Sequence, residues 1–405
     1  MEQDVELSFS RNLKLQMAVL SISMITILGS TAVSPALAGI KSAFPMYSDS
    51  TIQLILTIPP LFIIPSCCLC GYLARKWGKK KVLISGILLY LAGGLGAGAM
   101  PGFYSMLGAR ALLGIACGLI TPMAQALIST HFEGETRAKL TGYSSSASYL
   151  MGIIASFSVA ALAAANWRLA FLIYMIAVLV LVLNLKYLPD DRKKGETSKE
   201  RKQRGFNWKA WFVIFCMAGI NVAFYTFSTS IALFLKSESI GDDTTSGYTV
   251  SVFMAAGFLM GIAVPGIRKG LKSFTVTLGC VMMGAGYAGL ALSGSMPLII
   301  LSSACVGASY SIFYSSVFLK ISDLSRDDQE NTALVTFTTA GMFFGQTISV
   351  YLLQAAEAVF HMEGYRFRFL FLGGALFLAA AICVICCFLK HPLGMEKRSA
   401  EAVNG

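Results

Sequence analysis

The feature that most constrains this chain is a series of long apolar segments that recur along it, separated by short polar connections. A helix of roughly 20 apolar residues crosses the hydrocarbon core of a bilayer, and in lipid only helices and closed barrels satisfy their own backbone hydrogen bonds. Charged residues make up 13% of the chain, whereas they make up about 25% of soluble domains. The sequence therefore predicts an all-α membrane protein.

Twelve transmembrane helices are expected, six on each side of a hydrophilic stretch at residues 190–207. The first six spans are Leu15–Ile40, Thr51–Leu73, Val82–Ala99, Tyr104–Ile128, Leu140–Ala163 and Leu169–Leu188. The last six are Ala210–Leu235, Tyr248–Ile267, Phe274–Leu292, Pro297–Ile321, Thr332–Ala356 and Phe367–Leu389.

The hydrophilic stretch is too highly charged to support a packed core, so we interpret it as a linker. The expected division is a cytoplasmic N-terminus (1–14), a six-helix bundle (15–188), a cytoplasmic basic linker (189–208), a second six-helix bundle (209–389) and a cytoplasmic tail (390–405). The bundles are expected to be pseudo-symmetric, because Trp167-Arg168 matches Tyr365-Arg366 and Gly152 matches Gly345. Internal repeats with a site at their interface are common in transporters.

The net charge of +11 could suggest nucleic acid as a partner, but Lys and Arg form short clusters between apolar segments and not one basic face. Most of them fall on alternate connections, which places both termini in the cytoplasm by the positive-inside rule. The expected partners are a lipid bilayer and a small-molecule substrate, with no nucleic acid, and the chain is expected to be a monomer.

A basic turn, GYLARKWGKKKVL, follows the second expected span. Gly71 would permit close approach of helices and Gly78 a tight turn, while Lys79 and Lys80 would hold the loop at the cytoplasmic surface. These roles predict a gating loop between two spans.

The basic turn resembles the loop signature of the major facilitator superfamily, G-x-L-a-D-r-x-G-r-k, which stands between helices two and three. The pattern Arg110-x-x-x-Gly114-x-x-x-Gly118 and the pair Trp167-Arg168 add to a likeness that covers nearly the whole chain. The resemblance implies alternating access by two six-helix halves, and is nearest to bacterial drug and metabolite efflux members of the cell membrane. It implies a fold and does not identify a substrate.

Two departures from the family pattern stand out. Arg75 occupies the place of the acidic residue in the loop signature. We hypothesise a reversed pairing of Arg75 with Asp327, Asp328 and Glu330, which would also suit the positive end of a helix dipole; the alternative is that both clusters are solvated loop charges. The Gly-Pro element of proton-coupled drug antiporters is missing from residues 141–158, so antiport is not implied.

Arg110 is the one charged residue that falls clearly inside an expected span, where an ionised side chain costs about 2.5–3.5 kcal/mol and is a functional candidate. Gly114, Gly118, Thr121 and Gln125 continue its helical face. The resemblance implies that this helix lines a central cavity and that Arg110 handles substrate or protons. The alternative is that Arg110 extends to the membrane interface. No Asp or Glu lies deep in a span, which favours neutral or anionic substrates over cations.

Amide, hydroxyl and aromatic side chains complete the candidate site. With Arg110, the predicted substrate-binding residues are Thr121, Gln125, Asn221, Tyr225, Ser228, Tyr310, Tyr314, Thr339 and Gln346. The same polar stripes are also typical of helix–helix packing in lipid.

Prolines inside spans predict kinks that would act as hinges: Pro35, Pro59, Pro60, Pro65 and Pro122. The ten cysteines lie in apolar stretches and are expected to be inert thiols, so no metal site is predicted. No cofactor is expected beyond a coupling ion, for which H⁺ is the candidate.

The sequence thus predicts a secondary active transporter of a small organic molecule, with efflux of a neutral or anionic compound favoured. Uptake or exchange of an organic anion, with Arg110 as its counter-charge, is the alternative. A membrane-bound enzyme is disfavoured because the three histidines fall at helix ends and no catalytic pairing is visible. A channel is disfavoured because the chain has no acidic ring or pore loop.

Overall fold

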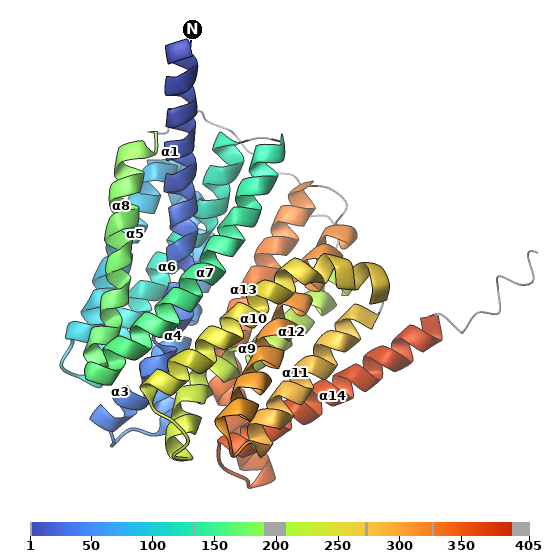
Figure 1. Ribbon diagram of the computed structural model, residues 1–405. Coiled ribbons are helices and arrows are strands. Elements are labelled where there is room, and N and C mark those ends of the chain that lie inside the picture. Colours follow the sequence, from blue (N-terminus) through green and yellow to red (C-terminus); the bar gives the residue numbers. More distant parts are fainter. Residues whose placement is uncertain (1, 133, 190–207, 272–273, 326–327, 391–405) are drawn as a thin grey trace, which may run out of the picture.

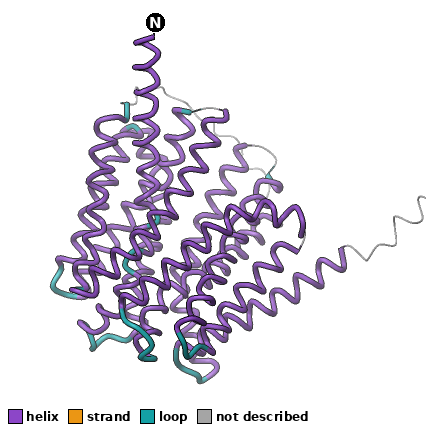
Figure 2. The backbone as a smooth tube through the Cα atoms, viewed as in Figure 1, coloured by secondary structure: helices purple, strands orange, loops and turns teal. Residues whose placement is uncertain are grey.

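The computed structural model describes residues 2–132, 134–189, 208–271, 274–325 and 328–390. Within these ranges every regular element is a helix, and short turns join the helices (Figure 2).

The helices before residue 190 are α1 (Glu2–Thr26), α2 (Leu28–Thr31), the 3-10 helix η1 (Ser34–Ala36), α3 (Leu37–Ala43), α4 (Asp49–Trp77), α5 (Lys79–Ala99), α6 (Phe103–His131), α7 (Gly134–Ala165), the 3-10 helix η2 (Trp167–Met175) and α8 (Ile176–Tyr187). Those after residue 207 are α9 (Trp208–Ser237), α10 (Asp243–Leu271), α11 (Thr275–Leu292), α12 (Met296–Leu324), α13 (Asp328–Phe360) and α14 (Tyr365–Lys390).

Among the residues described, ten helical segments are long and apolar enough to cross a membrane. They lie in α4, α5, α6, α7, η2 with α8, α9, α10, α11, α12 and α14. The other two expected spans correspond to α1, whose apolar part is Leu13–Thr26, and to the 33-residue helix α13. The chain is therefore a multi-pass membrane protein.

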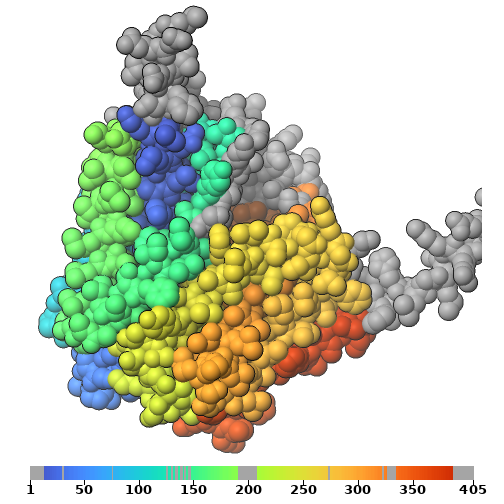
Figure 3. Space-filling model, in the orientation of Figure 1, coloured from blue at the N-terminus to red at the C-terminus, as the bar shows by residue number. Residues whose placement is uncertain are grey.

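Most helix pairs in contact come from the same side of residues 190–207, for example α5 with α6 and α11 with α14. Two extensive pairings cross between the sides, α4 with α13 and α7 with α10. Figure 1 shows the earlier helices, in blue to green, beside the later ones, in yellow-green to red. In Figure 3, α7 and α10 lie against one another on the visible face.

The two ends of the molecule differ in charge. The turn between α4 and α5, with its three lysines, and the last turn of α10, with Arg268 and Lys269, lie at one end, which we call the basic end. The connections α3–α4, α9–α10 and α13–α14 lie at the other, which we call the opposite end.

The turn at the basic end requires glycine. Gly78 has φ +89° and ψ 151°, a conformation that side chains with a Cβ rarely adopt. The predicted tight turn at Gly78 is confirmed. The prediction for Gly71 is wrong for the described part of the chain, because a Cβ placed there would meet no described atom within 4 Å.

The first expected span, Leu15–Ile40, is not one continuous helix. The α-helix ends at Thr26 and is followed by α2, η1 and α3. Pro35 lies in the first turn of η1, in agreement with the kink predicted there. The interruption has a structural use, because carbonyl groups released from helical hydrogen bonding become acceptors for other side chains.

The matched motifs of the two halves make matching contacts. Arg168, at the start of η2, donates to the carbonyls of Gly98 and Met100 at the end of α5, both at 2.8 Å. Arg366, at the start of α14, donates to the carbonyl of Ala291 at the end of α11, also at 2.8 Å. A guanidinium therefore caps the negative, C-terminal end of α5 before the linker and of α11 after it.

Candidate functional site

A cavity of about 550 Å³ lies between helices from both sides of the linker. The earlier helices α1, α6 and α7 and the later helices α9, α10, α12 and α13 form its wall. The contributing residues extend from the middle of the helices toward the basic end, as Thr121 does in α6 and Ser315 in α12. The volume is in the range of sites for small organic molecules.

The described side chains that line the cavity are uncharged, and most of them are polar or aromatic. They are Ser23, Thr26, Ile27, Thr121, Ala124, Ser144, Ser148, Tyr149, Phe224, Met254, Phe258, Gly261, Ile262, Tyr310, Ser311, Tyr314, Ser315, Thr339, Met342, Phe343 and Gln346. A charged ligand would therefore meet no opposite charge among these residues, and its desolvation would be uncompensated.

An amide–phenol network lies in the wall where α9, α12 and α13 meet. The Nδ2 of Asn221 donates to the carbonyl of Met217 at 3.0 Å. Its Oδ1 accepts from the Tyr310 hydroxyl at 3.2 Å and from Nε2 of Gln346 at 3.4 Å. Asn221 itself is 0% exposed. Asn221 thus holds the cavity-lining side chains of Tyr310 and Gln346 in place through hydrogen bonds on the side away from the cavity.

Aromatic rings form the adjoining part of the wall. Phe224 and Tyr310 are stacked, with ring centroids 3.8 Å apart and planes at 27°. Tyr149 and Phe258 form a second pair across the α7–α10 contact, at 6.4 Å. These rings offer flat apolar surfaces to a ligand that carries an aromatic group.

Arg110 is fully buried and is not among the residues that line the cavity. Its Nε donates to the carbonyl of Ile55 at 2.8 Å, Nη1 to the Tyr174 hydroxyl at 2.6 Å and Nη2 to the carbonyl of Gly29 at 3.4 Å. With 0% exposure, the side chain does not extend to the membrane interface. In this conformation its charge is held by neutral acceptors inside the protein.

Prolines in α4 leave backbone carbonyls free to accept hydrogen bonds from buried side chains. Pro59 and Pro60 have no N–H, so the carbonyls four residues earlier are free of helical hydrogen bonds. The first of these, on Ile55, accepts from Arg110, and the second, on Leu56, accepts from the Tyr225 hydroxyl at 2.5 Å. The α-helix continues through all three of its prolines.

The stripe expected on α6 divides into two. A Cβ at Gly114 would lie 2.4 Å from the carbonyl oxygen of Pro59, and one at Gly118 would lie 2.5 Å from Cβ of Ser66. This part of the stripe therefore packs against α4 and does not line the cavity. Thr121 does line it, and the side chain of Gln125 lies outside the described part of the chain.

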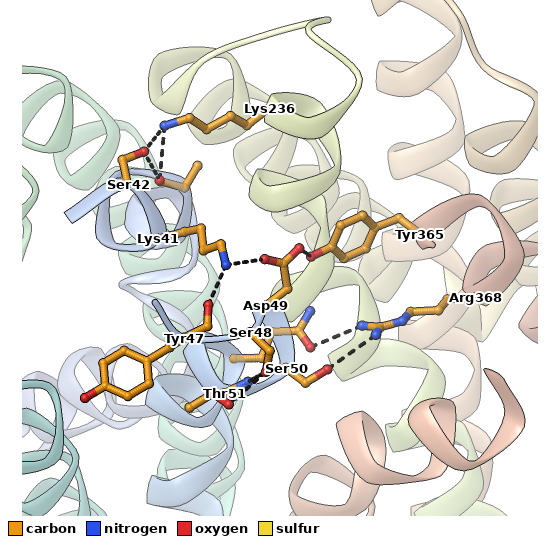
Figure 4. A network of polar contacts seen from close by, with 12 residues as sticks. Lys41, Ser42, Tyr47, Ser48, Asp49, Ser50, Thr51, Lys236, Tyr365 and Arg368 are labelled. Carbon is orange, nitrogen blue, oxygen red and sulfur yellow. Dashed lines mark hydrogen bonds and ion pairs between the residues drawn. The ribbon is translucent and has the colours of Figure 1, made fainter. Parts of the chain in front are cut away.

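A polar network joins the two sides of the chain at the opposite end (Figure 4). Lys41 forms an ion pair with Asp49 at 3.1 Å, and the Tyr365 hydroxyl donates to the same carboxylate at 2.5 Å. Nearby, Lys236 donates to the carbonyl of Ala38 at 3.2 Å and to the hydroxyl of Ser42. We call the set Lys41, Ser42, Asp49, Lys236 and Tyr365 the end network. It connects α3 and α4 to α9 and α14.

Arg368 lies beside the end network and is 6% exposed. Its Nε pairs with Glu357 at 2.8 Å, and its terminal nitrogens reach Oε1 of Gln53 at 3.3 Å and the Ser50 hydroxyl at 3.4 Å. Gln53 in turn donates to the carbonyl of Thr229 at 3.0 Å. These contacts tie α4 to α9, α13 and α14.

Apart from Arg110 and Gln125, the predicted substrate-binding residues fall into three groups. Those that line the cavity are Thr121, Tyr310, Tyr314, Thr339 and Gln346. Asn221 lies directly behind them. Tyr225 and Ser228 are 0% exposed at the contact between α9 and the earlier helices, where the carbonyl of Ser228 accepts from Ser34.

The predicted pairing of Arg75 with acidic residues falls outside the described side chains. Asp327 lies outside the described residues, and Asp328 and Glu330 are described only as backbone in the first turn of α13. Lys79 and Lys80 begin α5, as the loop motif requires. The pairing stays a prediction.

Several residues of the cavity and the end network were not predicted from the sequence. Ser23, Ser144, Ser148 and Tyr149 line the cavity from α1 and α7, yet serine and tyrosine give no distinctive spacing there. Arg368 was missed because it stands at the start of a span, where a charge is ordinary. Its place in the first turn of α14, shortly after Glu357 in the last turn of α13, is a signal that could have found it.

No group of three or more potential metal ligands is found among the residues the structure describes. Membrane-length helices around a shared, uncharged cavity are the construction of a membrane transport protein. The sequence model of the Major Facilitator Superfamily matches residues 19–350, which is more than half of the chain. The chain therefore belongs to this superfamily.

Individual relatives agree with this assignment. The chain is 28% identical over 181 residues to a puromycin resistance protein, pur8, of Streptomyces alboniger. That match covers 44% of this chain and 35% of the other, so the chain matches about a third of the length of this curated relative.

Solved structures share the fold. A nucleoside transporter, NupG, is 12% identical with a TM-score of 0.73, covering 92% of this chain and 99% of that one. A bacterial homologue of the human lysosomal transporter Spinster, in an inward-facing and occupied conformation, is 14% identical with a TM-score of 0.71, covering 93% and 97%. A D-xylose–proton symporter is 14% identical with a TM-score of 0.70, and the match covers 92% of this chain and 97% of that one.

Proposed function

We propose that this protein exports a small organic molecule across a bacterial cell membrane by alternating access. Twelve spans form two six-helix bundles, residues 15–188 and 209–389, with the basic end, both termini and the linker in the cytoplasm. The substrate occupies the cavity between the bundles, and the protein works as a monomer.

The observation that carries this proposal is the position of the cavity. It lies between helices from both sides of the linker and extends toward the basic end, while the end network joins the same two sides at the opposite end. A site that is shared by two bodies and sealed at one end is what alternating access requires.

Export is favoured over uptake by two features. A cavity directed to the cytoplasmic side is positioned to load substrate from inside the cell. The puromycin resistance protein among the relatives also carries a name that describes protection from a toxic compound. For coupling we propose H⁺, supplied by a gradient across the membrane.

Transport into inverted membrane vesicles tests the proposal. Vesicles from cells that produce the protein are energised with a pH gradient and given a mixture of neutral, anionic and cationic aromatic compounds, puromycin among them, and the vesicle contents are measured by mass spectrometry. We expect protein-dependent accumulation of at least one neutral or anionic compound.

A cavity-filling variant serves as the negative control. Ala124→Trp places a large side chain in the cavity wall and should abolish accumulation. Ala161→Trp, on the exposed face of α7, is the matched control and should retain it. Accumulation that Ala124→Trp does not reduce would contradict the assignment of the cavity as the substrate site.

The second candidate is uptake or exchange of an organic anion with Arg110 as counter-charge. The observation in its favour is that, among the described residues, Arg110 has no carboxylate partner and donates to neutral acceptors. This candidate predicts anion entry into right-side-out vesicles that is lost in Arg110→Gln.

A further inference from the structure

The orientation of the Gln346 amide follows from its neighbours. Asn221 must turn Nδ2 toward the carbonyl of Met217, because a carbonyl can only accept. Its Oδ1 therefore faces Gln346, and because this oxygen can only accept, Gln346 must donate to it from Nε2. The Oε1 of Gln346 is consequently directed away from this network. It has no hydrogen-bond partner among the described atoms, although the side chain is only 6% exposed.

Other polar groups of the wall are also left as acceptors. The hydroxyl protons of Thr26, Ser148, Ser311 and Thr339 are donated to backbone carbonyls, and that of Tyr310 to Asn221. Each of these oxygens keeps a lone pair but has no proton to offer a ligand. At these positions the wall therefore offers acceptors to an incoming molecule.

Flat apolar surface lies next to these acceptors. Tyr310 belongs both to the amide–phenol network and to the stack with Phe224. A ligand group bound at Gln346 would place an attached ring beside these aromatic side chains. The described lining offers no charge to compensate an ionised ligand.

We infer that Gln346 is a specificity-determining residue, and that the substrate is an uncharged molecule with an N–H or O–H donor next to an aromatic ring. The hydrogen bond from Nε2 of Gln346 to Asn221 leaves Oε1 as the free acceptor of the amide. A small rotation of the side chain directs Oε1 into the cavity, where it binds the donor of the substrate. This inference rests on the proposed function, because it takes the cavity as the substrate site.

Four naphthalene probes of similar size separate the effect of the hydrogen-bond donor from the effect of charge. They are N-(2-naphthyl)acetamide, its N-methyl analogue without the N–H, 2-naphthoate and 2-naphthyltrimethylammonium. Binding to the purified protein in detergent is measured by saturation-transfer NMR. Flux of the same probes into vesicles is measured in parallel.

The expected result is that N-(2-naphthyl)acetamide binds about tenfold more tightly than its N-methyl analogue, as one neutral hydrogen bond would give. In Gln346→Met the preference should disappear, through loss of acetamide affinity with little change for the N-methyl analogue. Gln354→Met is the matched control on the exposed face of α13 and should keep the preference. The two ions should bind most weakly.

Two kinds of result would overturn the inference. Equal affinity for both neutral probes, or a preference that survives in Gln346→Met, would show that Oε1 does not select the donor. Tightest binding of 2-naphthoate, or no binding of the acetamide, would exclude the uncharged class. If probes cross the membrane without donor preference, the inference fails while transport stands. If no probe and no compound of the mixture is moved in a protein-dependent way, the proposed function fails as well.

Discussion

At the scale of single residues, Arg110 shows how a charge can be retained inside a membrane protein without a carboxylate. Its three donor contacts go to two backbone carbonyls and one tyrosine. The carbonyl of Ile55 is available because Pro59 cannot bond to it, and that of Gly29 because the first span is interrupted. The guanidinium therefore links α4, α6, η2 and the interruption after α1.

This arrangement predicts that Arg110→Lys destabilises the ligand-free protein. Lysine keeps the charge but cannot donate in three fixed directions, so at least one buried acceptor loses its partner at a cost of about 1–3 kcal/mol. The midpoint of thermal denaturation in detergent should fall by several degrees. Arg168→Lys should have a smaller effect, because Arg168 is partly exposed and water can replace its bonds. An unchanged midpoint, together with lost anion binding, would instead identify Arg110 as a substrate counter-charge.

The sequence singles out Arg110 but not its surroundings. A charge inside an apolar run is visible in any window, whereas the acceptors that hold it come from Gly29, Ile55 and Tyr174, distant in sequence. Asn221 is a similar case. The sequence shows that Asn221 and Tyr225 share one face of a predicted helix. The orientation that Asn221 imposes on Gln346 depends instead on contacts between three helices.

At the scale of helices, the pairing of α4 with α6 depends on small residues. Gly114 and Gly118 lie against the backbone of α4. Close backbone approach of this kind is how helices gain packing energy in lipid, where no hydrophobic effect drives them together.

Two alanine substitutions in α6 should therefore have opposite effects. Gly114→Ala places a Cβ 2.4 Å from the carbonyl oxygen of Pro59 and should destabilise the protein by about 1–3 kcal/mol through overpacking. Gly108→Ala meets no described atom within 4 Å and should be neutral, or stabilise by up to about 1 kcal/mol through helix propensity. Both are measured as shifts in the denaturation midpoint. Equal shifts for the two variants would contradict the close α4–α6 contact.

The positions of the helices are predictable because their signals, the length of an apolar segment and the residues of the turn that ends it, lie within a short stretch of the sequence. The tight turn at Gly78 and the irregular backbone at Pro35 follow from their own backbone chemistry. The role of Gly71 was predicted wrongly, since a glycine in a helix does not reveal whether another helix faces it. The contact of Arg368 with Glu357 was missed because it forms between α13 and α14.

At the scale of the whole molecule, the two ends are built differently. The opposite end carries charged and hydroxyl groups that connect the two sides of the chain, including the Asp49–Tyr365 contact (Figure 4). At the same end Arg366 donates to Glu238 at 2.6 Å and holds the pKa of that carboxyl below its ordinary value. Toward the basic end, helices from both sides of the chain enclose the cavity.

In the proposed alternating access, the two sides move so that the cavity opens at one end as it closes at the other. Distances between spin labels on the two sides measure this movement. One label pair joins Tyr104 and Leu292, which are exposed at the opposite end, and another joins Trp77 and Leu271 at the basic end. Labels on non-natural amino acids leave the ten native cysteines in place.

The decisive comparison is between the native protein and the double variant Asp49→Asn, Tyr365→Phe, which weakens the end network. The account predicts that the Tyr104–Leu292 distance lengthens in part of the population while the Trp77–Leu271 distance shortens. If both distances stay fixed, or if both lengthen together, the two ends are not coupled and the account of alternating access is contradicted.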